Sequence, residues 1–160
     1  MPESHIKQIA YVTTYDSTLP GSWSGIGFRM AEHILAAGVA LDRVGPLRHP
    51  RQPGLQVRSF LTRYFTGEKF LRSRHPAVLR GYAREVEQRL RRLKPDLILS
   101  PGTLPIACLH TDTPLIFWTD ATFDALVDFY PAYSNLCPQS KREGHAMEQA
   151  ALDRCALALY

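Results

Sequence analysis

Five short apolar segments, separated by helical or irregular stretches, constrain the fold of this chain more than any other feature. They cover residues 7–14, 39–44, 96–100, 114–118 and 156–160, and most of them are continuously apolar. Such runs are typical of strands that are buried on both faces of a parallel sheet. Strands that alternate with helices build this kind of sheet. The sequence therefore predicts an α/β protein with a Rossmann-like open parallel sheet of about five strands and helices on both faces.

Apolar periodicity predicts a helix in most of the stretches between these strands. The longer helices are expected over residues 24–37, 57–72, 76–94 and 140–155. Ser24 is expected to cap the first helix, Gly67 to break the second and Pro76 to begin the third. Shorter helical turns are expected over residues 104–110 and 121–129, and an irregular segment over residues 45–56.

The length of the chain, 160 residues, is typical of one domain, so a single domain is predicted over residues 1–160. Apolar residues make up 45% of the chain and charged residues 21%, which is ordinary globular composition. No secretory signal pattern opens the sequence. The three cysteines are odd in number and have no CxxC spacing, which indicates reduced thiols. Reduced thiols favour a cytoplasmic location.

The basic residues are concentrated in the middle of the chain. Residues 43–94 contain fourteen Lys or Arg against three Glu, whereas acidic residues outnumber basic ones on either side. A block of this kind attracts anions, although a solvated Arg-rich helix face is an equally good interpretation. The basic residues are not interleaved with an aromatic stacking platform, and no nucleic-acid-binding motif occurs. Nucleic acid is therefore not expected as a partner.

Polar or glycine-containing loops follow three of the predicted strands. In an open α/β sheet, ligands bind beyond the carboxyl ends of the strands, at the point where the strand order reverses. With a strand order of 3-2-1-4-5, that crevice lies beside the first strand. The candidate site residues in these loops are Ser24, Gly25, Ile26, Gly27, Ser100, Gly102, Thr103, Thr119 and Asp120.

The segment from Ser24 to Gly27 opens a predicted helix, whose free N–H groups and dipole favour a bound anion. Its two glycines would allow close approach of that anion, but they also fit a tight turn with close helix packing. Asp120 has two interpretations as well, because it can serve a site or cap the segment that follows it. A helix over residues 121–129 would place Asp120, Asp124 and Asp128 on one face, and a solvated acidic face is expected there rather than a metal site.

A second function class rests on the same glycines. Gly25-x-Gly27-x-x-Met30 is a partial dinucleotide fingerprint, with Asp42 as a ribose ligand at the end of the second strand. The third glycine is missing, and about ten residues separate the first strand from Gly25, whereas the fingerprint follows its strand directly. An NAD-type domain of an oxidoreductase is therefore one alternative. A non-catalytic module that binds anions or a partner is another.

Four segments, taken in order, resemble a known family. They are SGIGFRMAEHILAAG running into VALDRVGPL, then KPDLILSPGTLPIACL, TPLIFWTDATFDALVDFYP and MEQAALDRCALALY. Together they resemble the N-terminal, acceptor-side domain of a family-4-like glycosyltransferase of the GT-B type. The resemblance covers essentially the whole chain, and the order and spacing of the motifs are more specific than any one of them.

The resemblance implies a retaining, metal-independent transfer of a sugar from a nucleotide-sugar to an acceptor. No cofactor is implied, because the nucleotide-sugar is a substrate. In this family a second Rossmann-like domain binds most of the donor, partly through a Glu-x7-Glu motif that these 160 residues do not show in its setting. A C-terminal donor-binding domain, in the same or another chain, is therefore an expected partner. The present chain alone is expected to be inactive.

The resemblance also implies roles for individual residues. Ser24 and Gly25 match the glycine loop that faces the donor diphosphate or the acceptor, with Ser24 in place of its first glycine. Thr119 stands where the family has its usual His, and Asp120 matches the Asp that follows, so Asp120 is the expected catalytic group. Members of the family often work at membrane surfaces through basic patches. The block from Arg58 to Lys94 is thus expected to contact an anionic membrane, at its inner face.

Overall fold

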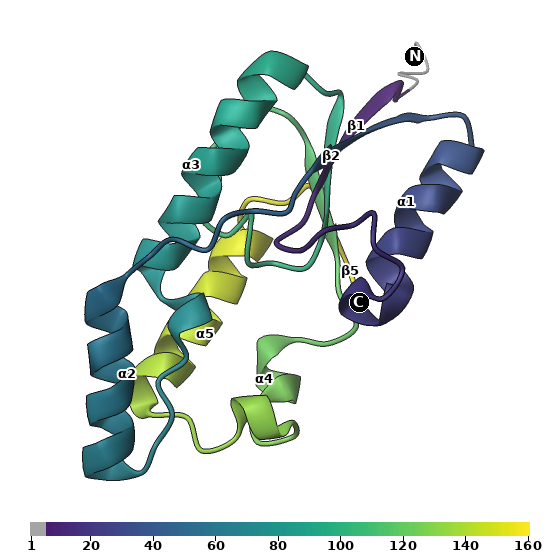
Figure 1. Ribbon diagram of the computed structural model, residues 1–160. Helices are drawn as coiled ribbons and strands as arrows, with labels where there is room; N and C mark the ends of the chain where they lie inside the picture. Colours follow the sequence, from purple (N-terminus) through teal and green to yellow (C-terminus); the bar gives the residue numbers. More distant parts are fainter. Residues whose placement is uncertain (1–5) are drawn as a thin grey trace.

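Five parallel strands form one sheet in the computed structural model, which describes residues 6–160 (Figure 1). The strands are β1 (Gln8–Val12), β2 (Ala40–Val44), β3 (Leu97–Pro101), β4 (Leu115–Trp118) and β5 (Leu157–Leu159). Each lies within one of the predicted apolar segments or overlaps it closely. The predicted α/β class and the open parallel sheet are confirmed.

The strand order is β2-β1-β3-β4-β5, so the expected order 3-2-1-4-5 is wrong. Strand β3 pairs with β1, on the side opposite to β2. The chain reaches β3 through α3 (Pro76–Leu93), which crosses β1 on one face of the sheet. The order therefore reverses between β1 and β3. Because β1, β3 and β4 are consecutive neighbours, the loops that follow them leave the sheet side by side.

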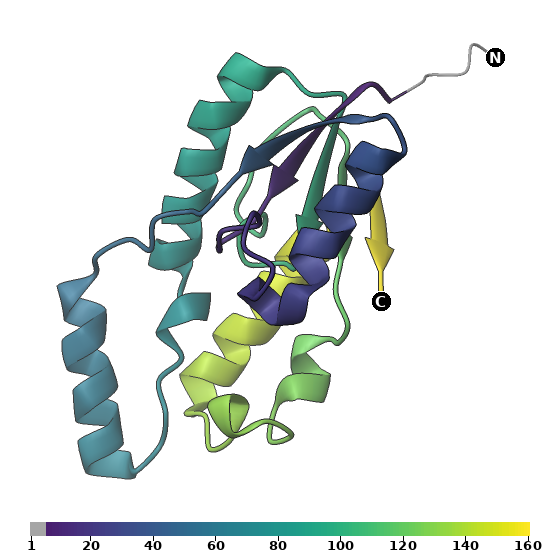
Figure 2. The same ribbon diagram turned by 45° about the vertical axis from the view of Figure 1, so that its right-hand side comes forward.

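Helices cover both faces of the sheet (Figures 1 and 2). Helix α1 (Ile26–Ala36) lies on one face, and α3 and α5 (Pro138–Leu152) lie on the other. Successive side chains of β1 point to opposite faces of the sheet, one toward α1 and the next toward α3 and α5. Val12 belongs to the core beneath α3, whereas Tyr11 faces α1 and donates a hydrogen bond from Oη to the Gly27 carbonyl oxygen, at 2.9 Å.

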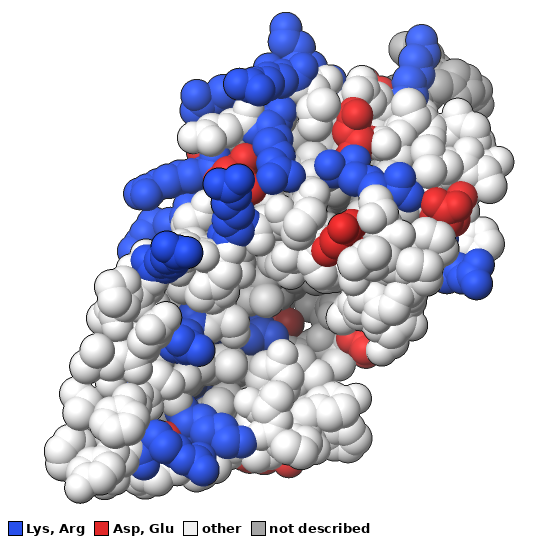
Figure 3. Space-filling view, viewed as in Figure 1, with Lys and Arg blue, Asp and Glu red and all other residues white. Residues whose placement is uncertain are grey.

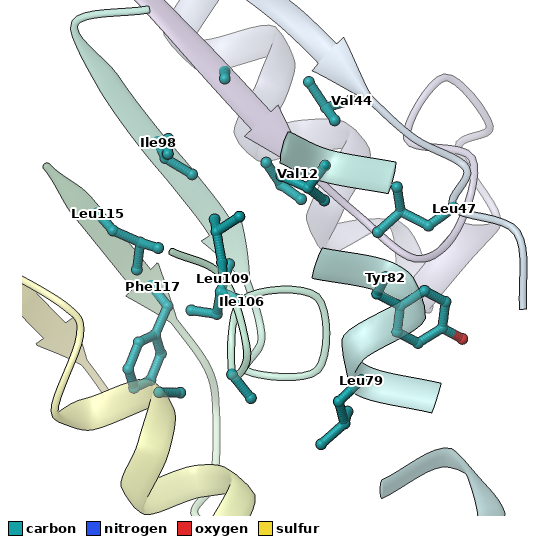
Figure 4. Packing of buried hydrophobic residues seen from close by; sticks show 14 of the residues in the cluster. Val12, Val44, Leu47, Leu79, Tyr82, Ile98, Ile106, Leu109, Leu115 and Phe117 are labelled. Carbon is teal, nitrogen blue, oxygen red and sulfur yellow. The ribbon is translucent and has the colours of Figure 1, made fainter. Parts of the chain in front are cut away.

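The main hydrophobic core fills the space between the sheet and the α3–α5 layer (Figure 4). Strands supply Val12, Val44, Ile98, Leu115 and Phe117 to it. Helix α3 buries an apolar stripe there, made of Val78, Leu79, Tyr82, Val86 and Leu90. The spacing of these α3 residues places them on one face of the helix, which explains why the helix packs on the sheet along its length.

The ends of the helices differ in places from the prediction. Ser24 does not cap α1, because it lies inside a short 3-10 turn, η1 (Ser22–Gly25), and Gly25 takes the capping position. Helix α2 (Pro53–Thr66) begins earlier than expected, with a proline in its first turn, and stops at Gly67, where φ is +72°. None of its residues is buried. No helix in the described part of the chain is long and apolar enough to cross a membrane.

The segments that border the site are shorter and less regular than predicted. Residues 104–108 form only a turn, although a short helix was expected over residues 104–110. Helix α4 (Phe123–Leu126) is a single turn, although the prediction extended it to residue 129. Two 3-10 turns, η2 (Arg72–Arg74) and η3 (Pro131–Tyr133), complete this region.

Candidate functional site

A cleft of about 390 Å³ opens at the carboxyl ends of β1, β3 and β4. The loops after the three strands supply Thr14, Tyr15, Gly102, Thr103, Thr119 and Asp120 to its lining. The opposite wall comes from η2, α4, η3 and the α5 helix. In Figure 3 the molecule is hollowed in the middle of this face, and basic and acidic atoms are both visible inside the hollow. This is the position beside the reversal of strand order where open α/β sheets bind ligands.

Aromatic rings form one side of the cleft. The Tyr15 and Trp23 rings lie with their centroids 6.0 Å apart, and the Trp23 and Trp118 rings meet edge to face at 5.9 Å. Tyr15 and Trp23 line the cleft directly. Ring faces of this kind offer an apolar surface to a ligand.

The backbone of η1 is left-handed over three consecutive residues. The φ angles are +48° at Trp23, +54° at Ser24 and +82° at Gly25. Non-glycine residues in this region are strained, and such strain is often found at ligand sites. A Cβ atom on Gly25 would also lie 3.0 Å from the Pro20 carbonyl oxygen. The turn holds Trp23 against the cleft, while the Ser24 side chain is exposed.

Gly27 has a packing role that the structure makes explicit. A Cβ atom here would lie 2.0 Å from Tyr15 Oη, so the missing side chain lets the Tyr15 ring rest against α1. Within residues 6–160 the buried Tyr15 hydroxyl has no hydrogen-bond partner, and burial raises its pKa to about 12. Neither Ser24, Gly25 nor Ile26 lines the cleft, although no side chain within the described residues caps the N–H groups at the start of α1.

The three candidates after β3 have different positions. Ser100 is fully buried, and its Oγ lies 3.1 Å from the Val12 carbonyl oxygen and 2.8 Å from that of Gly102. These hydrogen bonds link the end of β3 to β1 and to the following loop, and Ser100 does not line the cleft. Gly102, with φ of +119°, and Thr103 both line the cleft.

Thr119 and Asp120 lie together at the end of β4 and both line the cleft. The Thr119 side chain is half-buried and Asp120 is exposed. Asp120 is not the cap of α4, because Thr122 takes that role and its Oγ1 accepts a hydrogen bond from the Ala125 N–H at 3.2 Å. The alternative in which Asp120 caps a helix is therefore wrong, and its carboxylate is left facing the cleft.

The acidic face expected from Asp120, Asp124 and Asp128 does not form, because α4 is too short. Asp128 instead pairs with Lys141 at 3.3 Å, and its pKa is lowered because it accepts the Asn135 N–H and faces this lysine. Asp124 lies 3.8 Å from His145. Across residues 6–160, no group of three or more His, Cys, Asp or Glu side chains is arranged to hold a metal ion.

Most residues that line the cleft were not predicted as site residues, and Arg74, Tyr133 and Glu148 are among them. Both carboxylate oxygens of Glu148 accept the Phe123 N–H at 2.9 Å, which fixes the start of α4. Arg74 is only 6% exposed. Nothing in the sequence separates it from the thirteen other basic residues of the block from 43 to 94.

Asp42, the ribose ligand of the dinucleotide alternative, lies within β2 rather than at its end. It pairs in register with Ala10 and accepts a hydrogen bond from Gln8 Nε2. It does not line the cleft.

Comparisons with protein-family models, with curated proteins and with solved structures give no match for this chain.

Proposed function

We propose that this chain is the acceptor-side domain of a glycosyltransferase of the GT-B type, and that sugar transfer takes place at the cleft. The observation that carries the proposal is the combination of an aromatic wall with hydroxyl and carboxylate groups at the reversal of strand order. A sugar presents apolar C–H faces and a rim of hydroxyls. A site for it therefore needs ring faces together with a few well-placed polar groups.

The chemistry proposed is transfer from a nucleotide-sugar to an acceptor hydroxyl, with retention and without a metal. The bond from the anomeric carbon to the diphosphate breaks, a bond from that carbon to the acceptor oxygen forms, and the proton of the acceptor hydroxyl passes to the departing diphosphate. Asp120 would orient the reacting sugar and stabilise the positive charge that develops on its ring, with Thr119 beside it. The start of α1 lies outside the lining of the cleft, so its N–H groups would meet the departing diphosphate only where the donor extends beyond the cleft, toward a second, donor-binding domain that would hold the nucleotide.

Intrinsic fluorescence tests this proposal, because Trp23 lines the cleft and the other tryptophan of the chain, Trp118, packs against it. We expect hexoses and nucleotide-sugars to change the emission saturably. The Trp118→Phe variant isolates the signal of Trp23, which lines the cleft. A response to NADH alone would favour the oxidoreductase alternative. The absence of any saturable response to carbohydrates or nucleotide-sugars would contradict the transferase proposal.

We also propose that α2 docks this domain on an anionic membrane, at its inner face. The helix exposes Phe60 by 68% and Phe65 by 75%, and Phe60 stacks on Tyr64 with centroids 6.2 Å apart. Arg58 and Arg63 on the same helix are also exposed. A helix that combines exposed aromatic residues with arginines is typical of segments that lie in a membrane interface. Figure 3 shows further basic residues gathered along the same side of the molecule, over α3.

Sedimentation with lipid vesicles tests the docking role of α2. We expect binding to anionic vesicles that exceeds binding to neutral ones and weakens with added salt. The double variant Phe60→Ser and Phe65→Ser should bind about tenfold more weakly, because it removes apolar area from the interface. Phe129→Ser is the matched control, since Phe129 is 74% exposed but follows α4. Equal binding to neutral and anionic vesicles would refute this role.

A further inference from the structure

Arg74 is a buried cation that faces the cleft, and it has no acidic partner among residues 6–160. It lines the cleft and is only 6% exposed. No ion pair among residues 6–160 includes Arg74, and its Nη1 donates a hydrogen bond to Met147 Sδ at 3.7 Å. Burying a charge is costly unless an opposite charge compensates it. The packing of the fold alone therefore does not account for the charge of Arg74.

Two aromatic rings hold the Arg74 guanidinium in place. Its central carbon lies 4.4 Å from the centroid of the Phe123 ring and 5.5 Å from that of Tyr133. These contacts orient the planar group and keep water from its flanks, but the rings carry no net negative charge. A guanidinium that is fixed and partly desolvated is well suited to bind a carboxylate or phosphate through two parallel hydrogen bonds.

The carboxylates of the cleft do not serve as the missing partner. Glu148 uses both of its oxygens to accept the Phe123 N–H. Asp120 lies exposed at the end of β4, and neither carboxylate is within ion-pair distance of Arg74. Both would repel an anion that entered the cleft. A ligand is therefore best placed with its anionic group against Arg74 and its hydroxyl groups toward the carboxylates.

The geometry points to Arg74 as the residue that binds an anionic group, a phosphate or a carboxylate, on the acceptor sugar. This inference rests on the proposed function and narrows the acceptor to sugar phosphates and sugar acids. The donor diphosphate is another source of the same chemistry. However, the proposed place of the diphosphate is near the start of α1, which adjoins Trp23 and the aromatic side of the cleft. Arg74 packs instead with α4 and η3, on the opposite wall. The anionic group that Arg74 binds is therefore assigned to the acceptor.

Calorimetric titration of the 160-residue chain tests the inference with four probes: a hexose monophosphate, a hexuronate, the neutral hexose and a nucleoside diphosphate. We expect one of the anionic sugars to bind roughly 10- to 100-fold more tightly than the neutral hexose. Arg74→Met keeps the apolar stem and should abolish this difference while leaving the neutral hexose unaffected. Arg74→Lys should restore part of it, because the charge remains. Arg72→Met is the matched control, because Arg72 is exposed and lies outside the cleft.

The outcomes separate this inference from the proposed function. Equal binding of neutral and anionic hexoses by the unmodified chain would overturn the role of Arg74 and leave the transferase proposal standing. Loss of nucleoside diphosphate binding alone in Arg74→Met would also overturn it and assign the residue to the donor. Failure of every sugar to bind would overturn both. If Arg74→Met does not fold, the unmodified chain still tests the inference, because equal binding of neutral and anionic hexoses would overturn the role of Arg74.

Discussion

Transfer by the Asp120→Asn variant should fall by about two orders of magnitude, measured with the donor-binding domain present, as expected for loss of a charge that stabilises the transition state. The substitution keeps the shape of the side chain and removes its negative charge. Asp120 is exposed, lines the cleft and does not cap α4. The variant should therefore unfold at nearly the same denaturant concentration as the unmodified protein, since no hydrogen bond or ion pair within residues 6–160 depends on the charge of Asp120.

Asp112→Asn is the matched control for this prediction. Asp112 is also exposed, but it precedes β4 and lies near the amino ends of β3 and β4, in a separate hollow with Lys94. Its substitution should leave the turnover number unchanged. Near-normal transfer by Asp120→Asn would remove Asp120 from the mechanism. A fall in both variants would indicate a general effect of net charge rather than a role at the cleft.

The strands could be predicted from the sequence because burial on both faces of a sheet demands continuous apolar runs. Their order could not. A right-handed crossover from β2 can place β3 beside β2 with its helix on one face, or beside β1 with its helix on the other. The stripe on α3 from Val78 to Leu90 fits both arrangements. Only the packing of α3 across β1 selects the second one.

The candidate site was predictable as far as it depends on the strands. Residues after the carboxyl ends of neighbouring parallel strands must lie at one edge, which is why Thr103, Thr119 and Asp120 meet in the cleft. The glycine loop was less predictable. Ser24 is a favoured capping residue, yet the left-handed turn at Trp23 rotates it out of the capping position.

The opposite wall of the cleft, formed by η2, α4, η3 and α5, could not be predicted from the sequence. Arg74 gains its place there only through rings supplied by Phe123 and Tyr133, from segments that are distant in the sequence. No local pattern marks such contacts. Glu148 shows the same limit, because nothing in its local sequence indicates that its carboxylate binds the backbone at the start of α4.

The Phe117→Ala variant should lose about 3–5 kcal/mol of unfolding free energy, the usual cost of removing a fully buried phenyl ring. Phe117 is 0% exposed, pairs in register with Ser100 and Ala158, and packs beneath α5 in the core (Figure 4). Its ring also meets the Tyr160 ring edge to face, at 6.0 Å. A domain of this size is typically stable by about 5–15 kcal/mol, so the loss is a large share of the total.

Phe60→Ala is the matched control, because it removes the same ring from the exposed surface of α2, where no residue is buried. Its unfolding free energy should change by no more than about 0.5 kcal/mol. Urea unfolding measures both variants, and a common slope with a shifted midpoint for Phe117→Ala identifies a loss of native stability. A loss below about 1 kcal/mol would mean that α5 does not pack on β4 as described, since a ring sealed between them cannot be removed without leaving a cavity. Glu148 lies on α5 and binds the start of α4, so that outcome would also contradict the described position of the opposite wall of the cleft.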